Sequence, residues 1–188
     1  DRSAGGTGGR DTLVERARRA LDHDEFVPFY QPQVDIETEA IVGAEALLRW
    51  VTPEGVLDAK EFAHALEDPV VASRVSAAIL DRVCEDVATL HALIHRPFRV
   101  SVNASRTEVL RNDFLETFLD RLRQGRLRPD DFMIEITEDV VLGLADRKLQ
   151  DKIGFLASSG VEFALDDFGT GYASLIHITS FPIKEIKV

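Results

Sequence analysis

Short runs of β-branched and aromatic residues alternate with helical patterns along most of this 188-residue chain. Six runs have the composition of strands; they lie at 26–36, 40–50, 98–104, 132–138, 161–167 and 185–188. Between them, the spacing of apolar residues predicts helices near 60–67 and over about 73–93, 113–124 and 146–157. Strands that alternate with helices at this spacing predict an α/β fold with a largely parallel sheet.

The first 22 residues differ from the rest. Residues 1–10, DRSAGGTGGR, have the composition of a flexible linker. Over 11–23 apolar residues recur at helical spacing and predict an amphipathic helix, with one face formed by Leu13, Ala17, Ala20 and Leu21. We therefore expect a linker and leader helix over 1–22 and a folded domain over 23–188.

Polar side chains of the kind that bind ligands lie at or near the ends of the predicted strands. They are Glu45, Asn103, Glu135, Asp166 with Asp167 beside it, and Lys187 in the last run. Side chains two apart in a strand share a face, so these residues share theirs with mostly small neighbours: Gly43, Ser101, Met133 and Ala164. The opposite faces are apolar and suit packing against helices; they carry Val42, Val100, Val102, Ile134, Ile136, Phe163 and Leu165.

The number of strands that contribute polar residues favours a barrel. A (β/α) barrel builds its site from the carboxyl ends of several strands. An open doubly wound sheet, which is the alternative, binds its ligand at a switch point near one or two strands. Since four or five successive strands contribute here, we expect a TIM-type barrel with these residues at its mouth.

Such a cluster of acids predicts a metal site. Converging carboxylates repel one another and are costly to desolvate unless a cation binds among them. Every candidate ligand is an oxygen donor, which selects hard cations such as Mg²⁺, Mn²⁺ or Ca²⁺. The adjacent pair Asp166–Asp167 indicates that one carboxylate bridges two metal ions.

The amino-acid composition limits which partners the protein can bind and where in the cell we expect it. With 33 acidic and 22 basic residues the net charge is −11, and this field repels nucleic-acid polymers and anionic membranes. For an anionic substrate to bind, the negative field of the protein must be reversed locally, and a bound metal ion can supply the positive charge for this. We find no signal peptide and no apolar run of membrane-spanning length in the sequence, so we expect a cytoplasmic domain, whose parent protein could still be membrane-anchored.

Other notable side chains have ordinary structural explanations. Cys84 lies in an apolar helical pattern and is expected in the core. Trp50 suits either a pocket wall or packing at the barrel rim. The pair His91 and His95 has metal-ligand spacing, but a helix end at the surface explains it better. Asp139 and Glu162 are expected to be solvated or to cap helices.

Six segments of the chain form an ordered set of motifs. They are YQPQVD (30–35), GAEALLRW (43–50), VNAS (102–105), EITE (135–138), DDFGTGYASL (166–175) and FPIKEIKV (181–188). In order and spacing they resemble the motifs of the EAL domain family, the cyclic di-GMP phosphodiesterases, with GAEALLRW similar to the family signature. The resemblance extends from about residue 22 to residue 188.

The resemblance implies a fold and an activity. The family fold is a (β/α)₈ barrel whose first strand runs antiparallel to the others. The family activity is hydrolysis of cyclic di-GMP to linear pGpG with Mg²⁺ or Mn²⁺, in bacterial second-messenger signalling. Two alternatives stay open: an inactive EAL-type receptor that holds cyclic di-GMP without cleaving it, and a barrel phosphoesterase that acts on another substrate.

The resemblance also implies residue roles. Glu45, Asn103, Glu135 and Asp166 are similar to the ligands of the first metal, Asp166 bridges to the second, and Asp167 binds that one. Lys187 corresponds to the lysine that holds the attacking water, and Glu138 to the glutamate that fixes the loop around DDFGTG. Gln31, Leu47 and Arg49 correspond to positions that contact the dinucleotide, Arg49 through a phosphate. The family also implies a homodimer and an upstream sensory or GGDEF-type domain.

Two departures from the family pattern are visible. The segment AKEFAHALED (59–68) lacks two prolines that the family has there, for which we expect a local effect only. The chain stops at Val188, where the family continues with an aspartate and two further βα units. A full barrel needs about 250 residues, so we expect about six strands here, with an incomplete second metal site and an isolated chain of poor solubility or stability.

Overall fold

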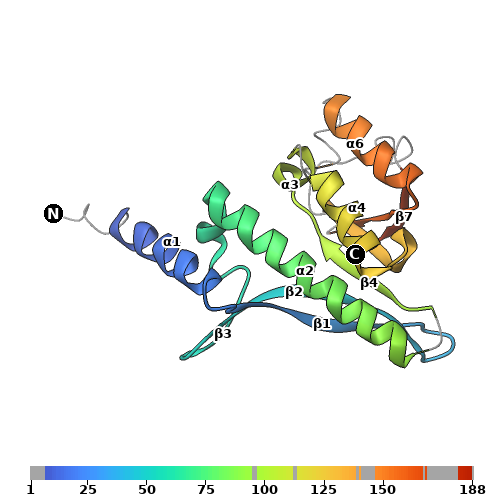
Figure 1. Ribbon diagram of the computed structural model, residues 1–188, viewed down its shortest axis with the longest axis horizontal. Helices are drawn as coiled ribbons and strands as arrows, with labels where there is room; N and C mark the ends of the chain where they lie inside the picture. The colour runs from blue at the N-terminus through green and yellow to red at the C-terminus, as the bar shows by residue number, and fades with distance from the viewer. Residues whose placement is uncertain are drawn as a thin grey trace. The chain divides into compact units, whose positions relative to one another are not determined.

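The computed structural model describes residues 7–94, 97–111, 114–138, 140, 147–166, 168 and 182–187, with the backbone alone at 7–11 and 115. Figure 1 follows these elements along the chain. In chain order they are α1 (Thr7–Leu21), β1 (Phe26–Val34), β2 (Ile41–Thr52), β3 (Gly55–Asp58), η1 (Ala63–Glu67), α2 (Pro69–Leu93), β4 (Arg99–Asn103), α3 (Arg106–Leu110), α4 (Phe114–Gly125), η2 (Pro129–Asp131), β5 (Phe132–Thr137), α6 (Arg147–Ser158), β6 (Glu162–Asp166) and β7 (Ile183–Ile186).

The strands pair in the order β1-β2-β4-β5-β6-β7, and β3 pairs with β2 off this path. From β2 onward the pairs along the path are parallel. At one end of the first hairpin the Asp35 N–H donates to the Ala40 carbonyl, and at the other the Val51 N–H donates to the Glu25 carbonyl. This descending register makes β1 antiparallel to β2. The predicted α/β fold, with a parallel sheet and an antiparallel first strand, is confirmed.

The chain divides into two compact units, of which the first comprises residues up to 29 and 47–83. Its core is an aromatic cluster in which the Trp50 ring lies 5.1 Å from Phe26 and 5.6 Å from Phe62, the latter edge-on. Ala17 and Ala20 of α1 are buried in this cluster, with Leu13 and Leu21 packed against it. The predicted apolar face of the leader helix is therefore confirmed.

The second unit comprises residues 30–46 and 84–188. Helices α4 and α6 contribute buried residues at helical spacing, Phe118 and Leu122 from one and Leu149, Ile153 and Leu156 from the other. Of the seven strand residues that were expected to face helices, five are fully buried, namely Val100, Ile134, Ile136, Phe163 and Leu165, and Val102 is half-buried. Cys84 is buried as expected. Val42 is an exception, 46% exposed, because it lies just ahead of the part of β2 that pairs with β4.

Short elements and boundaries differ from the sequence expectations. Strand β3 was not predicted; it forms because the tight turn at Thr52–Gly55 folds it antiparallel onto β2. Gly55 has φ +149°, which favours glycine in that turn. Helix α1 begins at Thr7, inside the segment expected to be a linker. The Ser105–Glu108 capping box is confirmed and starts the short α3.

Charged side chains link the starts of three strands in the second unit. Arg99 of β4 donates to Glu162 of β6 at 2.6 Å and to Glu185 of β7, and Lys184 also donates to Glu162. The expectation that Glu162 is solvated or capping is wrong, because its side chain is only 20% exposed and its carboxylate lies between two cations. Burial opposes its ionisation, yet the hydrogen bonds from Lys184 and Arg99 hold the pKa of Glu162 below its ordinary value.

We expect Glu162→Gln to lower the free energy of unfolding at neutral pH by about 1 kcal/mol. Because the folded pKa of Glu162 is depressed, its contribution is present above the unfolded pKa and is lost as the pH falls through the folded pKa. Urea unfolding of wild type and variant should therefore differ at pH 7 and converge once the pH has fallen below the folded pKa of Glu162. The exposed Glu85→Gln is the control. A difference that stays constant with pH would contradict this ion-pair account.

Candidate active site

The register of the parallel strands brings the predicted polar residues onto one face of the second unit. Glu45 pairs with Ser101, Asn103 with Glu135, and Thr137 with Asp166. Because directly paired residues of neighbouring strands point to the same side of a sheet, these side chains share a face. The parity prediction for these residues is confirmed. Asn103, Glu135 and Asp166 lie at or near the ends of β4, β5 and β6, whereas Glu45 lies in the first half of β2 and not near its end, because β2 extends to Thr52.

Lys187 joins two of these carboxylates. Its Nζ donates to Glu45 Oε2 and to Glu135 Oε2, each at 2.6 Å. Asn103 Nδ2 donates to the other Glu45 oxygen at 3.1 Å. Hydrogen bonds from the Lys187 N–H to the Leu165 carbonyl, and from the Phe168 N–H to the Lys187 carbonyl, hold the lysine backbone beside β6. Four side chains that are far apart in sequence thus form one contiguous polar cluster.

Burial and charge set the ionisation of this cluster. Burial raises the pKa of Glu135, and the attraction of Lys187 only partly offsets it. Burial also opposes ionisation of Glu45, but hydrogen bonds from Lys187 and Asn103 outweigh it and lower the pKa of Glu45. For Lys187 burial alone would lower the pKa, yet the two carboxylates raise it above its ordinary value. The lysine is therefore positively charged throughout the neutral range.

One oxygen of the cluster has no hydrogen-bond partner. Glu135 has a fully buried side chain on whose carboxylate Lys187 and the Ser101 hydroxyl act, while its Oε1 has no hydrogen-bond partner of ordinary geometry among the described residues. An unpartnered carboxylate oxygen in a buried site costs free energy, which a cation would offset. Glu45, Asn103 and Glu135 would each offer a side-chain oxygen as a metal ligand, and magnesium and manganese prefer oxygen ligands. Within the described chain, no group of three or more His, Cys, Asp or Glu side chains is close enough to hold a metal.

The remaining predicted metal and loop residues have different positions. Asp166 is half-buried at the end of β6, on the same face as the cluster. Asp167, the predicted ligand of a second ion, lies outside the described residues. Glu138 is buried directly after β5. In the loop that it is predicted to fix, around DDFGTG (166–171), residues 167 and 169–171 lie outside the described part of the chain, so both roles stay predictions.

The three predicted substrate contacts lie on the first hairpin. Gln31 is exposed on β1, in the second unit. Leu47 and Arg49 are half-buried on β2, in the first unit. The Arg49 guanidinium donates to the Leu48 carbonyl at 2.8 Å. These residues are candidates for substrate contact, and their roles stay predictions.

Two residues of this face were not proposed as site residues from the sequence. Ser101 is fully buried one row below Asn103 on β4, and Gln33 of β1 donates to its hydroxyl at 3.4 Å. Strand alternation could have revealed both, because Ser101 is two residues from Asn103 and Gln33 is two residues from Gln31, so each shares a face with a predicted site residue. This contact supports the base of the cluster rather than its open side.

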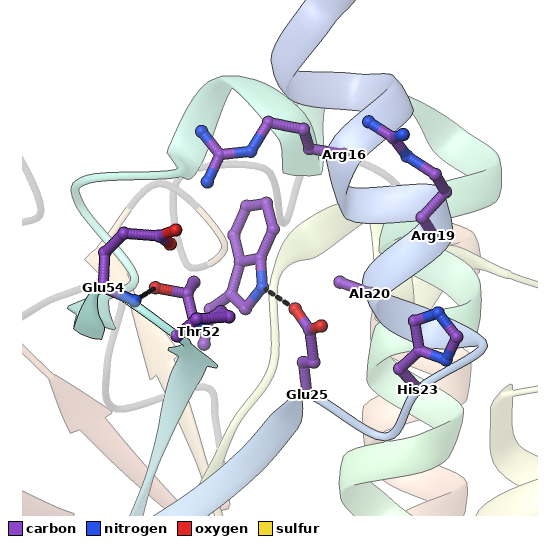
Figure 2. A pocket seen from close by; sticks show the side chains of 9 residues that line it. Arg16, Arg19, Ala20, His23, Glu25, Thr52 and Glu54 are labelled. Carbon is purple, nitrogen blue, oxygen red and sulfur yellow. Dashed lines mark hydrogen bonds between the residues drawn. The ribbon is translucent and has the colours of Figure 1, made fainter.

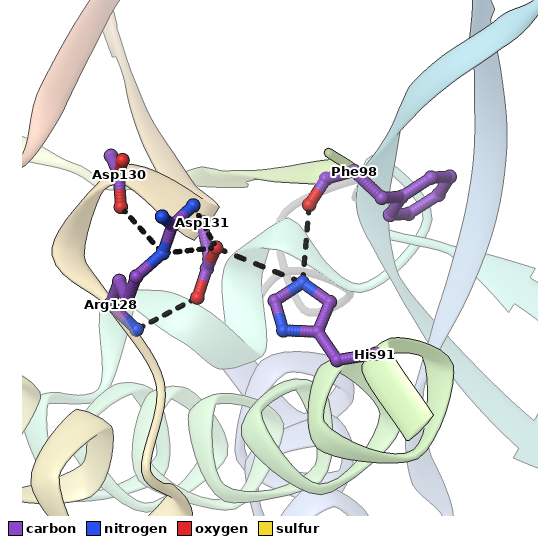
Figure 3. Close-up of polar contacts among 5 residues, drawn as sticks. All are labelled: His91, Phe98, Arg128, Asp130 and Asp131. Carbon is purple, nitrogen blue, oxygen red and sulfur yellow. Dashed lines mark hydrogen bonds and ion pairs between the residues drawn. The ribbon is translucent and has the colours of Figure 1, made fainter. Parts of the chain in front are cut away.

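His91 has a structural position. Its Nε2 lies 3.5 Å from the Phe98 carbonyl and 3.7 Å from Asp131 Oδ1 (Figure 3). Asp131 is buried and accepts from the Arg128 backbone at 2.7 Å. The imidazole therefore links α2 to the start of β5, which agrees with the structural explanation. His95 lies outside the described residues.

Comparison with known proteins identifies the family. The EAL domain family model matches residues 14–188. This chain belongs to the EAL domain family. The bifunctional diguanylate cyclase/cyclic di-GMP phosphodiesterase MucR of Pseudomonas aeruginosa is 29% identical over 177 residues, covering 94% of this chain and 26% of MucR. The cyclic di-GMP phosphodiesterase NbdA of the same species is 30% identical, covering 94% of this chain and 22% of NbdA.

Solved EAL structures share the fold. The MucR phosphodiesterase in complex with cyclic di-GMP has a TM-score of 0.88 and 29% identity, over 94% of this chain and 72% of that one. The EAL enzyme Bd1971, in its form with cAMP and cyclic di-GMP, has a TM-score of 0.91 and 25% identity, over 98% and 51%. The chain spans roughly a quarter of the length of three curated relatives that it matches.

In the described part of the chain, no helix combines the length and the hydrophobicity that crossing a bilayer requires.

Proposed function

We propose that this EAL domain hydrolyses one phosphodiester bond of cyclic di-GMP to give linear pGpG, with two Mg²⁺ or Mn²⁺ ions. Family membership and relatives named as cyclic di-GMP phosphodiesterases support this proposal. The observation that carries it is the buried, unpartnered Oε1 of Glu135 beside Glu45 and Asn103. Such an oxygen in an all-oxygen cluster suits a hard divalent cation.

Glu45, Asn103, Glu135 and Asp166 are the residues proposed to hold the first ion, and Asp166 with Asp167 the second. When bound, such cations would neutralise phosphate charge and lower the pKa of a coordinated water. In the hydrolysis the water oxygen forms a bond to phosphorus, the bond from phosphorus to the ribose 3′ oxygen breaks, and that oxygen takes up a proton. The phosphate then stays on the 5′ oxygen, as in pGpG.

Lys187 contributes a fixed positive charge to this reaction. Its raised pKa keeps the ammonium protonated, and its position between Glu45 and Glu135 places that charge inside the cluster. A protonated ammonium can donate to the attacking water or to a phosphate oxygen on which negative charge develops. We assign Lys187 this orienting and stabilising role.

A second candidate function is a receptor that binds cyclic di-GMP without cleaving it. The observation that favours it is the same lysine, because its contacts at 2.6 Å compensate both carboxylates without any metal ion. In that case Lys187 would stay between Glu45 and Glu135, and Arg49 would supply the phosphate contact. The two candidates differ in turnover and in their need for metal.

We expect the full-length protein to convert cyclic di-GMP to pGpG with Mn²⁺ or Mg²⁺, and EDTA to stop the conversion. Liquid chromatography of the products measures turnover, and calorimetry measures cyclic di-GMP affinity in parallel. Binding with no pGpG in the presence of Mn²⁺ would establish the receptor instead. If the protein neither binds nor hydrolyses cyclic di-GMP, both candidate functions are contradicted.

Assembly and location belong to the same proposal. We infer a homodimer, an upstream sensory or GGDEF-type domain, and a cytoplasmic site of action. The name of MucR, which pairs a diguanylate cyclase with a phosphodiesterase activity, supports the inference about a neighbouring domain.

A further inference from the structure

A cavity of about 320 Å³ lies in the first unit, between the end of α1 and the turn from β2 to β3. This volume is at the lower end of the range for small-molecule pockets, about 300–1,000 Å³. Every residue that lines it belongs to the first unit. None of them is among the residues proposed for the phosphodiesterase reaction.

One side of the cavity carries basic groups from α1 and the turn after it. Arg16, Arg19 and His23 follow one another there at spacings of three and four residues, and the Arg16 guanidinium extends toward Glu54 (Figure 2). Within the described chain none of them has a carboxylate within 4 Å, whereas Arg18 of the same helix pairs with Glu15 and Asp68. Two arginines and a histidine without an ion pair on one wall of a cavity point to an anionic ligand.

The floor of the cavity is rigid. Trp50 is 1% exposed, and its indole N–H donates to Glu25 at 2.8 Å. The Arg16 guanidinium carbon lies 5.5 Å from the centre of the Trp50 ring, in the range of a cation–π contact. The indole therefore positions one guanidinium above it, so part of the anion site is formed before a ligand arrives.

The other side of the cavity offers acceptors. Glu54 and Thr52 lie there, and the Glu54 N–H donates to the Thr52 hydroxyl at 3.2 Å (Figure 2). The Glu54 carboxylate is exposed and can accept from hydroxyl or amino groups of a ligand. Together with the Glu25 carboxylate, which also lines the cavity, it repels a second negative group, so the cavity suits a ligand with one anionic end and a polar, uncharged body.

We propose that this pocket binds a small phosphate monoester, with its phosphate held by Arg16, Arg19 and His23 and its hydroxyl groups facing Glu54. Two guanidinium groups and an imidazole offer more donors than the two oxygens of a carboxylate can use. The three terminal oxygens of a phosphate monoester match them, and guanidinium forks bind phosphate in bidentate geometry.

The single tryptophan of the chain provides the test, because Trp50 forms the floor of the pocket. We expect ribose 5-phosphate to change its fluorescence saturably at constant ionic strength in the full-length protein, or its near-ultraviolet circular dichroism if other tryptophans are present there. Ribose, which lacks the phosphate, should leave both signals unchanged. The readout is independent of phosphodiesterase activity.

Two arginine variants test whether the signal change caused by ribose 5-phosphate arises from binding in this pocket. Arg19 is exposed, so Arg19→Gln should fold normally and weaken ribose 5-phosphate binding at least about tenfold. Arg123→Gln removes an exposed arginine of α4 outside the pocket and should bind as wild type does. The proposal is overturned if ribose 5-phosphate gives no saturable change, if ribose gives the same change, or if Arg19→Gln keeps wild-type affinity.

Discussion

Glu45→Gln is expected to reduce the rate of cyclic di-GMP hydrolysis by at least about 100-fold. The substitution keeps the size of the side chain but removes the charge that now binds Lys187 at 2.6 Å and accepts from Asn103 at 3.1 Å. A neutral amide is a weak ligand for a hard cation, so the Mn²⁺ affinity measured by calorimetry should fall as well. The measurement of rate is pGpG formation at saturating Mn²⁺.

The matched control is Glu37→Gln, which removes one exposed carboxylate from the turn between β1 and β2. It should leave both the rate and the Mn²⁺ affinity unchanged. Thermal unfolding followed by circular dichroism shows whether the Glu45 variant is folded. An unchanged rate in a folded Glu45→Gln protein would refute the role of Glu45 as a metal ligand.

The shared face of these site residues could be predicted, because the alternation of side chains within each strand can be read from a few neighbouring residues. Alternation along β4 and β5 places Asn103 and Glu135 on the face opposite Val102 and Ile134, and the register then sets them side by side. The order of the motifs supplied the family, which the match over 14–188 confirms.

The contacts of Lys187 could not be predicted in the same way. The residue is 142 positions from Glu45 and 52 from Glu135, and a distance of 2.6 Å to each depends on the shape of the whole sheet. Charge repulsion among the acids predicted a cation, and in the structure an ammonium group of the chain lies between two of them. The metal ion that this repulsion predicted stays a prediction, and the direct contacts of Lys187 with the two carboxylates had no signal in the sequence.

The ion pairs of Glu162 were missed for a related reason. The pattern of β6 shows an acid at the start of a strand, where solvent is the usual surrounding. Its partner Arg99 is 63 residues away on β4 and comes within 2.6 Å only through the strand register. Pairing between distant strands therefore decides which charged residues are solvated and which are buried.

Gly43→Ala is expected to lower the free energy of unfolding by about 1–3 kcal/mol, the cost of overpacking a filled core. Gly43 is buried on β2, where a Cβ atom would lie 2.5 Å from the Arg99 carbonyl oxygen and 2.9 Å from the Gln33 side chain. The first contact is with backbone of the neighbouring strand, so β2 and β4 must separate to admit a methyl group. Since Glu45 is two residues further along the same face, hydrolysis should fall together with stability.

Gly154→Ala is the matched control, because it adds the same methyl group where nothing lies within 4 Å. Gly154 lies inside α6, and alanine there should raise the free energy of unfolding by about 0.5–1 kcal/mol through helix propensity. Urea denaturation of the two variants should thus shift in opposite directions from wild type. Equal shifts would mean that the close approach of β4 to Gly43 does not constrain this position, and that the glycine before the Glu-Ala-Leu triplet has no packing role.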